Sequence, residues 1–168
     1  MKHVTRIEGK SKLTHIDTEG KTQMVDVGSK PQSLRTAIAR GHVTAQPETL
    51  RLISEQQMKK GNVLEVARLA GYMAAKRTSD LIPLCHPLNL TSIRVDVTIV
   101  DKKIEIEAEV QTVGRTGVEM EALTAVSVAA LTVYDMCKAV DREMCISDIK
   151  LIKKTGGTSG DFKIPEEK

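Results

Sequence analysis

Residues 92–110, SIRVDVTIVDKKIEIEAEV, carry the clearest pattern in the chain. Apolar side chains occupy every second position on each side of the DKK at 101–103: Ile93, Val95, Val97 and Ile99, then Ile104, Ile106, Ala108 and Val110. Successive side chains of a strand point to opposite faces, so a period of two gives one apolar and one polar face. The stretch therefore predicts an antiparallel hairpin that turns at DKK, with one face in the core and the other in water.

Helical patterns lie on both sides of this hairpin. Pro47 and Glu48 are typical of a first helical turn, and we expect that helix to end at Gly61. Residues 63–77 then repeat apolar side chains at helical spacing, which predicts a second helix. Residues 118–140 are rich in Ala, Leu, Val and Met on every side, which predicts one long and well-buried helix.

Two further strands complete the expected fold. A last strand is expected over residues 146–152, and residues 22–27, TQMVDV, give a weaker signal for a first strand. Residues 28–46 are ambiguous, because LRTAIARG also contains helix-forming residues before a glycine. The order of strand, helices, two strands, helix and strand is that of the ferredoxin-like fold. The fold class is therefore α+β, a ferredoxin-like antiparallel sheet with helices packed on one face.

The organisation of the chain follows from this fold. The free face of such a sheet is often covered by partner subunits, so we expect assembly as a symmetric oligomer. Residues 22–168 contain no flexible linker or internal repeat and are expected to form a single domain. Residues 1–21 are polar and lack a strong period, and we expect them to form an N-terminal arm, partly ordered or accessory.

The composition disfavours several classes of protein. Aromatic residues make up only 2% of the chain and the net charge is +3, which argues against base-stacking surfaces and nucleic-acid binding. The longest uncharged apolar run, residues 122–134, is shorter than the roughly 20 residues of a membrane span. The three cysteines lack CxxC spacing and no apolar signal segment is visible, so we expect a cytoplasmic protein.

Charged residues in the predicted long helix are confined to its ends. Glu119 and Glu121 stand at the start, and Asp135 and Lys138 stand near the finish. One interpretation is that Asp135 and Lys138 form an ion pair while the two glutamates interact with the helix dipole. The other is that all four belong to a binding pocket. Glu121 and Asp135 are 14 positions apart, which is roughly 21 Å along a helix axis. If both ends are catalytic, a small substrate needs one end from each of two subunits, which predicts a shared site at a symmetric interface.

Two loops carry further candidates. In KKTGGTSGD, residues 153–161, lysines and glycines suit an anion, although a flexible tail with turn residues has the same composition. In LIPLCHPL, residues 81–88, Cys85 and His86 are adjacent and point apart, and no HxxxH or CxxC accompanies them, so zinc is disfavoured. Cys85 as a nucleophile would need a base beside it in space. His86 is held between two prolines, which suits proton transfer or phosphate binding.

Four segments of the chain together resemble one known family. They are MVDV (24–27), KGNVLEVARLAGYMAAKRTSDLIPLCHPL (60–88), TGVEMEALTAVSVAALTVYDMCKAVD (116–141) and GGTSGDF (156–162). In this order they are similar to the cyclic pyranopterin monophosphate synthase (MoaC) family, the accessory C proteins of molybdenum cofactor biosynthesis. The resemblance covers about residues 22–163 and leaves out the first twenty residues.

The resemblance implies an activity and an assembly. It implies a lyase that converts (8S)-3',8-cyclo-7,8-dihydroguanosine 5'-triphosphate, made from GTP, to cyclic pyranopterin monophosphate with release of diphosphate. It implies a catalytic domain over residues 22–168 and a cytoplasmic homohexamer, a trimer of dimers, with active sites at subunit interfaces. Nucleic acid and membrane are not expected as partners. No cofactor is required by the sequence, and Mg²⁺ bound with the phosphates is compatible with the reaction.

Carried over residue by residue, the resemblance implies two sets of functional residues. The catalytic set is Asp135, Lys138, Lys60, His86 and Glu119. The substrate-binding set is Leu84, Cys85, His86, Met120, Glu121, Lys154 and Arg115, and no metal ligand is implied. We hypothesise that Asp135 orients and ionises Lys138, which acts as a general acid. The triphosphate needs cations, for which Lys154, Arg115 and Arg77 are candidates.

The chain departs from the family at two positions, and two other functions fit the fold. Thr158 stands where the family often has a lysine, so one phosphate-binding charge is missing, whereas Arg115 replaces another lysine and keeps its charge. A ligand-sensing module would explain the fold but not the charges beside the glycine loop. An RNA-binding ferredoxin-like protein would need aromatic side chains where the hairpin has Ile and Val.

Overall fold

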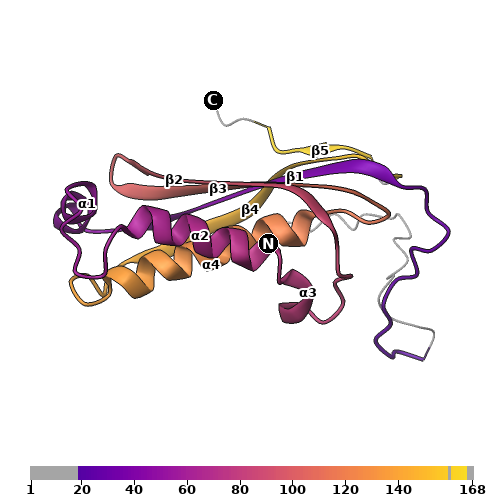
Figure 1. Cartoon of the computed structure of the whole chain (residues 1–168), viewed down its shortest axis with the longest axis horizontal. Coiled ribbons are helices and arrows are strands. Elements are labelled where there is room, and N and C mark those ends of the chain that lie inside the picture. The colour runs from indigo at the N-terminus through magenta and orange to yellow at the C-terminus, as the bar shows by residue number, and fades with distance from the viewer. Residues whose placement is uncertain (1–18, 159, 166–168) are drawn as a thin grey trace, which may run out of the picture.

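A computed structural model describes residues 19–158 and 160–165. An antiparallel sheet forms one layer, and helices cover one of its faces (Figure 1). The strands are β1 (Ser33–Thr44), β2 (Leu90–Val100), β3 (Lys103–Gly114), β4 (Cys145–Thr155) and the short β5 (Phe162–Lys163). The helices are α1 (Pro47–Ser54), α2 (Val63–Ala75), α3 (Thr78–Leu81) and α4 (Glu119–Cys137).

The connection of these elements is ferredoxin-like. The sheet order is β2-β3-β1-β4-β5, and every neighbouring pair is antiparallel. The path β1–α2–β2–β3–α4–β4 with β1 and β3 in the centre is the split βαβ arrangement. Because α2 and α4 cover the same face in Figure 1, the predicted α+β class is confirmed. The expected arm at residues 1–21 lies almost wholly outside the described residues.

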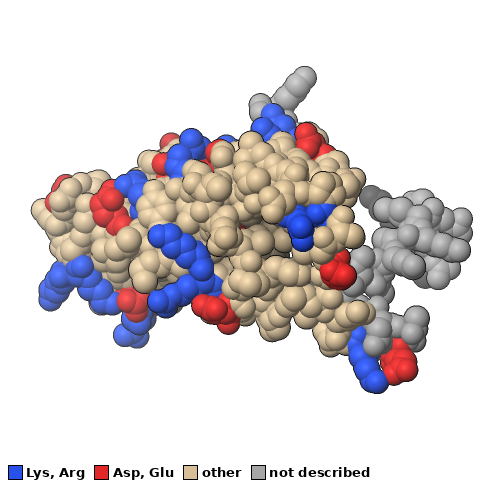
Figure 2. Space-filling model, turned by 45° about the vertical axis from the view of Figure 1, so that its right-hand side comes forward, with Lys and Arg blue, Asp and Glu red and all other residues tan. Residues whose placement is uncertain are grey.

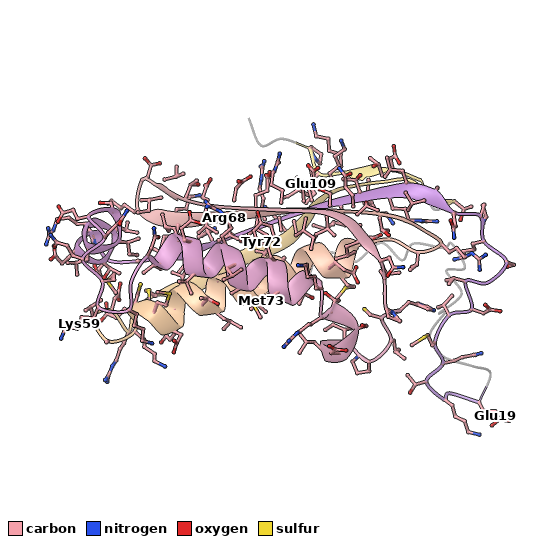
Figure 3. All side chains as sticks on the ribbon, viewed as in Figure 1. Glu19, Lys59, Arg68, Tyr72, Met73 and Glu109 are labelled. Carbon is pink, nitrogen blue, oxygen red and sulfur yellow. The ribbon has the colours of Figure 1, made fainter. Side chains whose placement is uncertain are left out.

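The predicted hairpin is present as β2 and β3. Ile99 pairs with Ile104, and the chain turns next to them at Asp101, which adopts a left-handed φ of 52°. The alternating apolar residues of β3 are buried beneath the sheet. Glu109 rises from the opposite, helix-free face (Figure 3), where Arg94 lies 3.7 Å from its carboxylate. The sheet therefore has one apolar and one charged face, as the period of two predicted.

The first strand is not where the sequence pattern placed it. The expected strand over residues 22–27 is wrong, because only an isolated bridge occurs there, at Thr22. The central strand β1 lies instead within the ambiguous region, and its inward side chains are Arg35, Ala37, Ala39, Gly41 and Val43. Small residues hide a period of two, because alanine is also typical of helices and glycine of turns.

Gly41 does not end a helix but lets α4 approach the sheet. A Cβ atom at this position would lie 2.8 Å from Cγ1 of Ile149 and 2.9 Å from Cγ1 of Val126. Both distances are shorter than side-chain contacts allow, so the packing of β1 between α4 and β4 requires glycine here.

Other boundaries shift by a few residues. The first helix ends at Ser54 rather than at Gly61, and Gln56 beyond it has a left-handed φ of 54°. A short loop follows, and the side chain of Asn62 accepts a hydrogen bond from the N–H of Glu65 to begin α2. The last strand, β4, is longer than expected, and the single-turn α3 was not predicted.

The long helix α4 is the centre of the core. It packs against α2 on one side and against β1, β3 and β4 on the other. By length and composition α4 could cross a membrane, but 56% of its most apolar window is buried inside the fold. The predicted buried helix is therefore confirmed over slightly narrower limits.

We predict that Gly41→Val lowers the free energy of unfolding by about 1–3 kcal/mol, because the added methyl groups overlap Ile149 and Val126. Thr98→Val is the matched control on the exposed face of β2, where we expect a change within about 0.5 kcal/mol. Urea unfolding of both variants measures the difference. Equal effects of the two substitutions would contradict the close approach.

Candidate active site

Three predicted residues meet at the C-terminal end of α4. The Asp135 carboxylate accepts hydrogen bonds from two ammonium groups, with Lys138 Nζ 2.7 Å from Oδ1 and Lys60 Nζ 2.8 Å from Oδ2. Lys138 comes directly after the end of α4, about one helical turn beyond Asp135. Lys60 lies in the loop between α1 and α2. Lys60 also donates to the backbone carbonyl of Asp135, at 2.8 Å. This Lys60–Asp135–Lys138 cluster joins segments 75 residues apart in the sequence.

The two lysines fix the charge state of this cluster. The hydrogen bond from Lys138, reinforced by the one from Lys60, lowers the pKa of Asp135 to about 2. The same contact raises the pKa of Lys138 above its ordinary value. At neutral pH Asp135 is therefore an anion and Lys138 a cation, so Lys138 carries a proton that it can donate and cannot act as a base.

The cluster lies on an open surface. The side chains of Lys60, Asp135 and Lys138 are 48%, 56% and 55% exposed. Leu131, one turn before Asp135 on the same side of α4, is 58% exposed although it is apolar. An exposed Lys–Asp–Lys cluster beside exposed leucine cannot exclude water from a substrate by itself, so a further surface is needed to enclose it.

Two adjoining hollows lie at the other end of α4. The first, the apolar hollow, has a volume of about 620 Å³. It is lined by Val25, Val27, Lys30, Ile82, Leu84, Cys85, His86, Leu88, Thr116, Gly117, Glu119, Met120 and Glu121. The second, the cationic hollow, is smaller, about 150 Å³. It is lined by Lys30, Arg35, Thr36, Arg115, Thr116, Gly117, Val118, Glu119, Lys154, Thr155, Gly156 and Thr158.

Glu121 is the most perturbed group of the apolar hollow. Only 4% of it is exposed, and it lies among apolar side chains. Burial, reinforced by the charge of nearby Glu119, raises the pKa of Glu121 to about 7. Burial and the Glu121 carboxyl together raise the pKa of Cys85. Cys85 is thus a protonated thiol at neutral pH, which argues against the nucleophile considered from its sequence.

The cationic hollow is built on a buried arginine. Arg35 is 7% exposed, and its guanidinium donates to the carbonyls of Gly114, at 2.9 Å, and Arg115, at 3.2 Å. The glycine loop lies directly on it, because a Cβ atom at Gly157 would be 2.1 Å from Arg35 Nη1. Gly157 also has a left-handed φ of 85°, so any other residue there would be strained and would have to displace the Arg35 guanidinium. Residues 156–158 are therefore a folded loop over a cation.

Glu119 lies between the two hollows and lines both of them. Its carboxylate is 3.1 Å from Nζ of Lys154, and both side chains are about three-quarters buried, at 28% and 27% exposure. This ion pair joins the start of α4 to β4. An anion entering the cationic hollow would compete with Glu119 for Lys154.

The structure thus divides the predicted site residues into two groups. Leu84, Cys85, His86, Met120, Glu119 and Glu121 come together in the apolar hollow, with Arg115 and Lys154 beside them in the cationic hollow. Lys60, Asp135 and Lys138 meet at the opposite end of α4. Arg77 lines neither hollow. One chain does not bring the two groups together, in agreement with the spacing argument.

Sequence reasoning missed two cations of the site, Lys30 and Arg35. Both come from the ambiguous region before and within β1. The signal for Arg35 is its place in the alternation: it occupies an inward position of β1, where a charge is retained only with buried partners. That signal becomes readable only once the strand itself has been located.

Outside these sites, the structure offers little support for nucleic-acid binding or metal binding. On the face in Figure 2, basic side chains form separate groups rather than one continuous surface, which gives no support to RNA binding. Within residues 19–158 and 160–165, no three His, Cys, Asp or Glu side chains gather as a metal site.

Comparisons with known proteins identify relatives over nearly the whole chain. A family model described as the MoaC family matches residues 24–157. The cyclic pyranopterin monophosphate synthase of Parvibaculum lavamentivorans is 64% identical over 155 residues, which is 90% of this chain and 96% of the relative. The proteins of the same name from Roseiflexus sp. RS-1 and Chloroflexus aurantiacus are 61% and 58% identical, over 90% and 94% of this chain. These two alignments each cover 98% of the relative.

We predict that the stability of the chain depends on the protonation of Glu121. The folded state keeps this proton up to about pH 7, whereas the unfolded chain releases it near pH 4.5. Ionisation therefore opposes folding, and the free energy of unfolding falls by roughly 3 kcal/mol as pH rises through that window. Urea unfolding at several pH values should show this slope in the wild type and lose it in Glu121→Gln. The same slope in both proteins would contradict it.

Proposed function

The chain belongs to the MoaC family, and on this premise we propose that it is a cyclic pyranopterin monophosphate synthase of molybdenum cofactor biosynthesis. This lyase converts (8S)-3',8-cyclo-7,8-dihydroguanosine 5'-triphosphate to cyclic pyranopterin monophosphate and diphosphate. The observation that carries the proposal is the 64% identity to a synthase over 90% of the chain. A cationic hollow joined to an apolar one suits a substrate with a triphosphate and a purine-derived ring.

In this proposal the cationic hollow holds the triphosphate. Lys154 and Arg115 carry the charges expected from the sequence, and Lys30 and the buried Arg35 add two more at the same place. Thr158 lines this hollow but brings no charge where the family often has a lysine. Arg35, beneath the glycine loop, is well placed to supply the missing positive charge to the phosphates. When a phosphate binds Lys154, it displaces Glu119, which then becomes an unpaired carboxylate beside the ring.

The apolar hollow takes the ring system. Leu84 and Met120 offer apolar contact, and Cys85 is a lining residue. Glu121 and His86 supply the polar groups that orient the ring. With its pKa near 7, Glu121 exchanges a proton readily at neutral pH. These two residues are our candidates for the proton transfers on the ring.

The Lys60–Asp135–Lys138 cluster supplies the general acid. Asp135 stays ionised between the two lysines and holds Lys138 as an oriented ammonium group. A positioned proton donor of this kind contributes typically about 10²–10⁴-fold to a rate. This scheme requires no cofactor. A Mg²⁺ ion bound to the triphosphate is compatible with the scheme.

A second subunit completes each site in this proposal. The cluster and the hollows are held roughly 21 Å apart, because Glu121 and Asp135 are 14 positions apart along α4. Exposed apolar residues on the helix layer offer a contact surface: Val66, Leu69 and Met73 on α2, and Leu131 on α4. Met73 projects from the side of α2 that faces away from the sheet (Figure 3). We propose a cytoplasmic homohexamer, a trimer of dimers, with sites at its interfaces and no nucleic-acid or membrane partner.

We predict that Lys138→Ala lowers diphosphate release from the cyclised substrate at least about a hundredfold, because the general acid is removed. Lys59→Ala is the matched control, since Lys59 is an exposed lysine next to Lys60 that lines neither hollow. The assay follows diphosphate and pterin product together. Near-normal turnover by Lys138→Ala would exclude the assigned role, and a wild-type chain that makes no product would defeat the proposed function itself.

A further inference from the structure

Asp141 is a buried carboxylate that none of the roles above uses. It is 4% exposed and lies four residues beyond the end of α4, and within the described part of the chain no Lys or Arg pairs with it. Three donors surround it instead. Oδ2 accepts from the backbone N–H of Gln46, at 2.8 Å, and from the hydroxyl of Thr49, at 3.1 Å. Oδ1 accepts from the backbone N–H of Glu143, at 3.0 Å.

These contacts make Asp141 the cap of a distant helix. Gln46 occupies the position before α1 where a capping side chain normally stands, but its own side chain makes no capping hydrogen bond. Asp141, 95 residues further along the chain, accepts from the N–H of Gln46, the donor that the side chain at the third helical position satisfies in a capping box. A carboxylate at a helix N-terminus also interacts favourably with the helix dipole. The start of α1 is therefore fixed to the turn that follows α4.

The segment capped by Asp141 leads directly to Lys60. Residues 46–61, here called the α1 arm, comprise α1 and a tight loop in which the Gln57 N–H donates to the carbonyl of Leu52, at 2.9 Å. The Gly61 N–H closes the loop on the carbonyl of Met58, at 3.0 Å. Leu50, Ile53 and Met58 anchor the α1 arm in the core. The arm is thus a packed unit, and Lys60 at its end returns to the carboxylate of Asp135.

The α1 arm is consequently tied to one end of α4 twice, through Asp141 at its start and Lys60 at its end. We infer that Asp141 is a positioning residue for the reaction: it sets the α1 arm so that Lys60 reaches Asp135 and the Lys60–Asp135–Lys138 cluster keeps its geometry. Its catalytic meaning rests on the proposed function, whereas the link from Asp141 to Lys60 is a property of the fold. Misplacement of a catalytic group by about 1 Å can cost 10²-fold in rate.

A purely structural cap would stabilise the chain without acting on Lys60, and a chemical readout separates the two roles. In Asp141→Asn one acceptor oxygen becomes an NH₂ group, which cannot accept from a backbone N–H. We expect the acetylation rate of Lys60, measured by mass spectrometry under native conditions, to rise towards that of neighbouring Lys59. The rate for Lys59 serves as the internal standard. In the synthase assay we expect kcat to fall about tenfold with little change in KM.

Two further variants keep the test decisive. Val97→Ala opens a cavity in the buried face of β2, a strand with which α1 makes at most minor contact, and should lower stability without changing the Lys60 to Lys59 rate ratio or kcat. Thr49→Val removes a single hydrogen bond to Asp141. It should raise the Lys60 acetylation rate and lower kcat, each by less than Asp141→Asn does. It also serves if Asp141→Asn fails to fold.

The inference is overturned if Asp141→Asn and Thr49→Val leave the Lys60 rate and kcat unchanged, or if Val97→Ala changes them equally. A wild-type chain without synthase activity would refute the proposed function instead, and the Lys60 labelling would still decide whether Asp141 positions that lysine.

Discussion

The close packing of α4 against β1 is the contact on which the rest of the structure depends. Gly41 leaves the space that Val126 and Ile149 fill, so the helix lies directly on the centre of the sheet. A helix held this tightly is a rigid spacer. It keeps Glu119 and Glu121 at one end and Asp135 at the other, with no freedom to bring them together within one chain.

The two ends differ in electrostatics as well as in position. At the C-terminal end two lysines lower the pKa of Asp135, whereas at the N-terminal end burial raises the pKa of Glu121. Environments that push two carboxyl groups in opposite directions give them different chemical parts: one stays an anion that orients a cation, and the other carries a proton near neutral pH. The different roles of Asp135 and Glu121 therefore come from the surroundings at the two ends of α4, and not from the residue types alone.

The sequence predicted those features that depend on local pattern. The hairpin of β2 and β3 follows from its period of two, and the separation of the helix ends follows from the rise of an α-helix. β1 was missed because Ala37, Ala39 and Gly41 carry almost no strand signal, and Arg35 was missed with it. The contact of Lys60 with Asp135 and the cap from Asp141 to α1 join residues 75 and 95 positions apart, and only tertiary packing creates them.

The most direct test of a site shared between two chains is a mixing experiment with Lys138→Ala and Glu121→Gln, each of which we expect to be inactive alone. The first variant keeps an intact N-terminal end of α4 and the second an intact C-terminal end. If sites form between subunits, chains unfolded and refolded together should recover roughly a quarter of wild-type activity. If each site lies within one chain, the mixture will stay as inactive as its components, and that result would contradict the account.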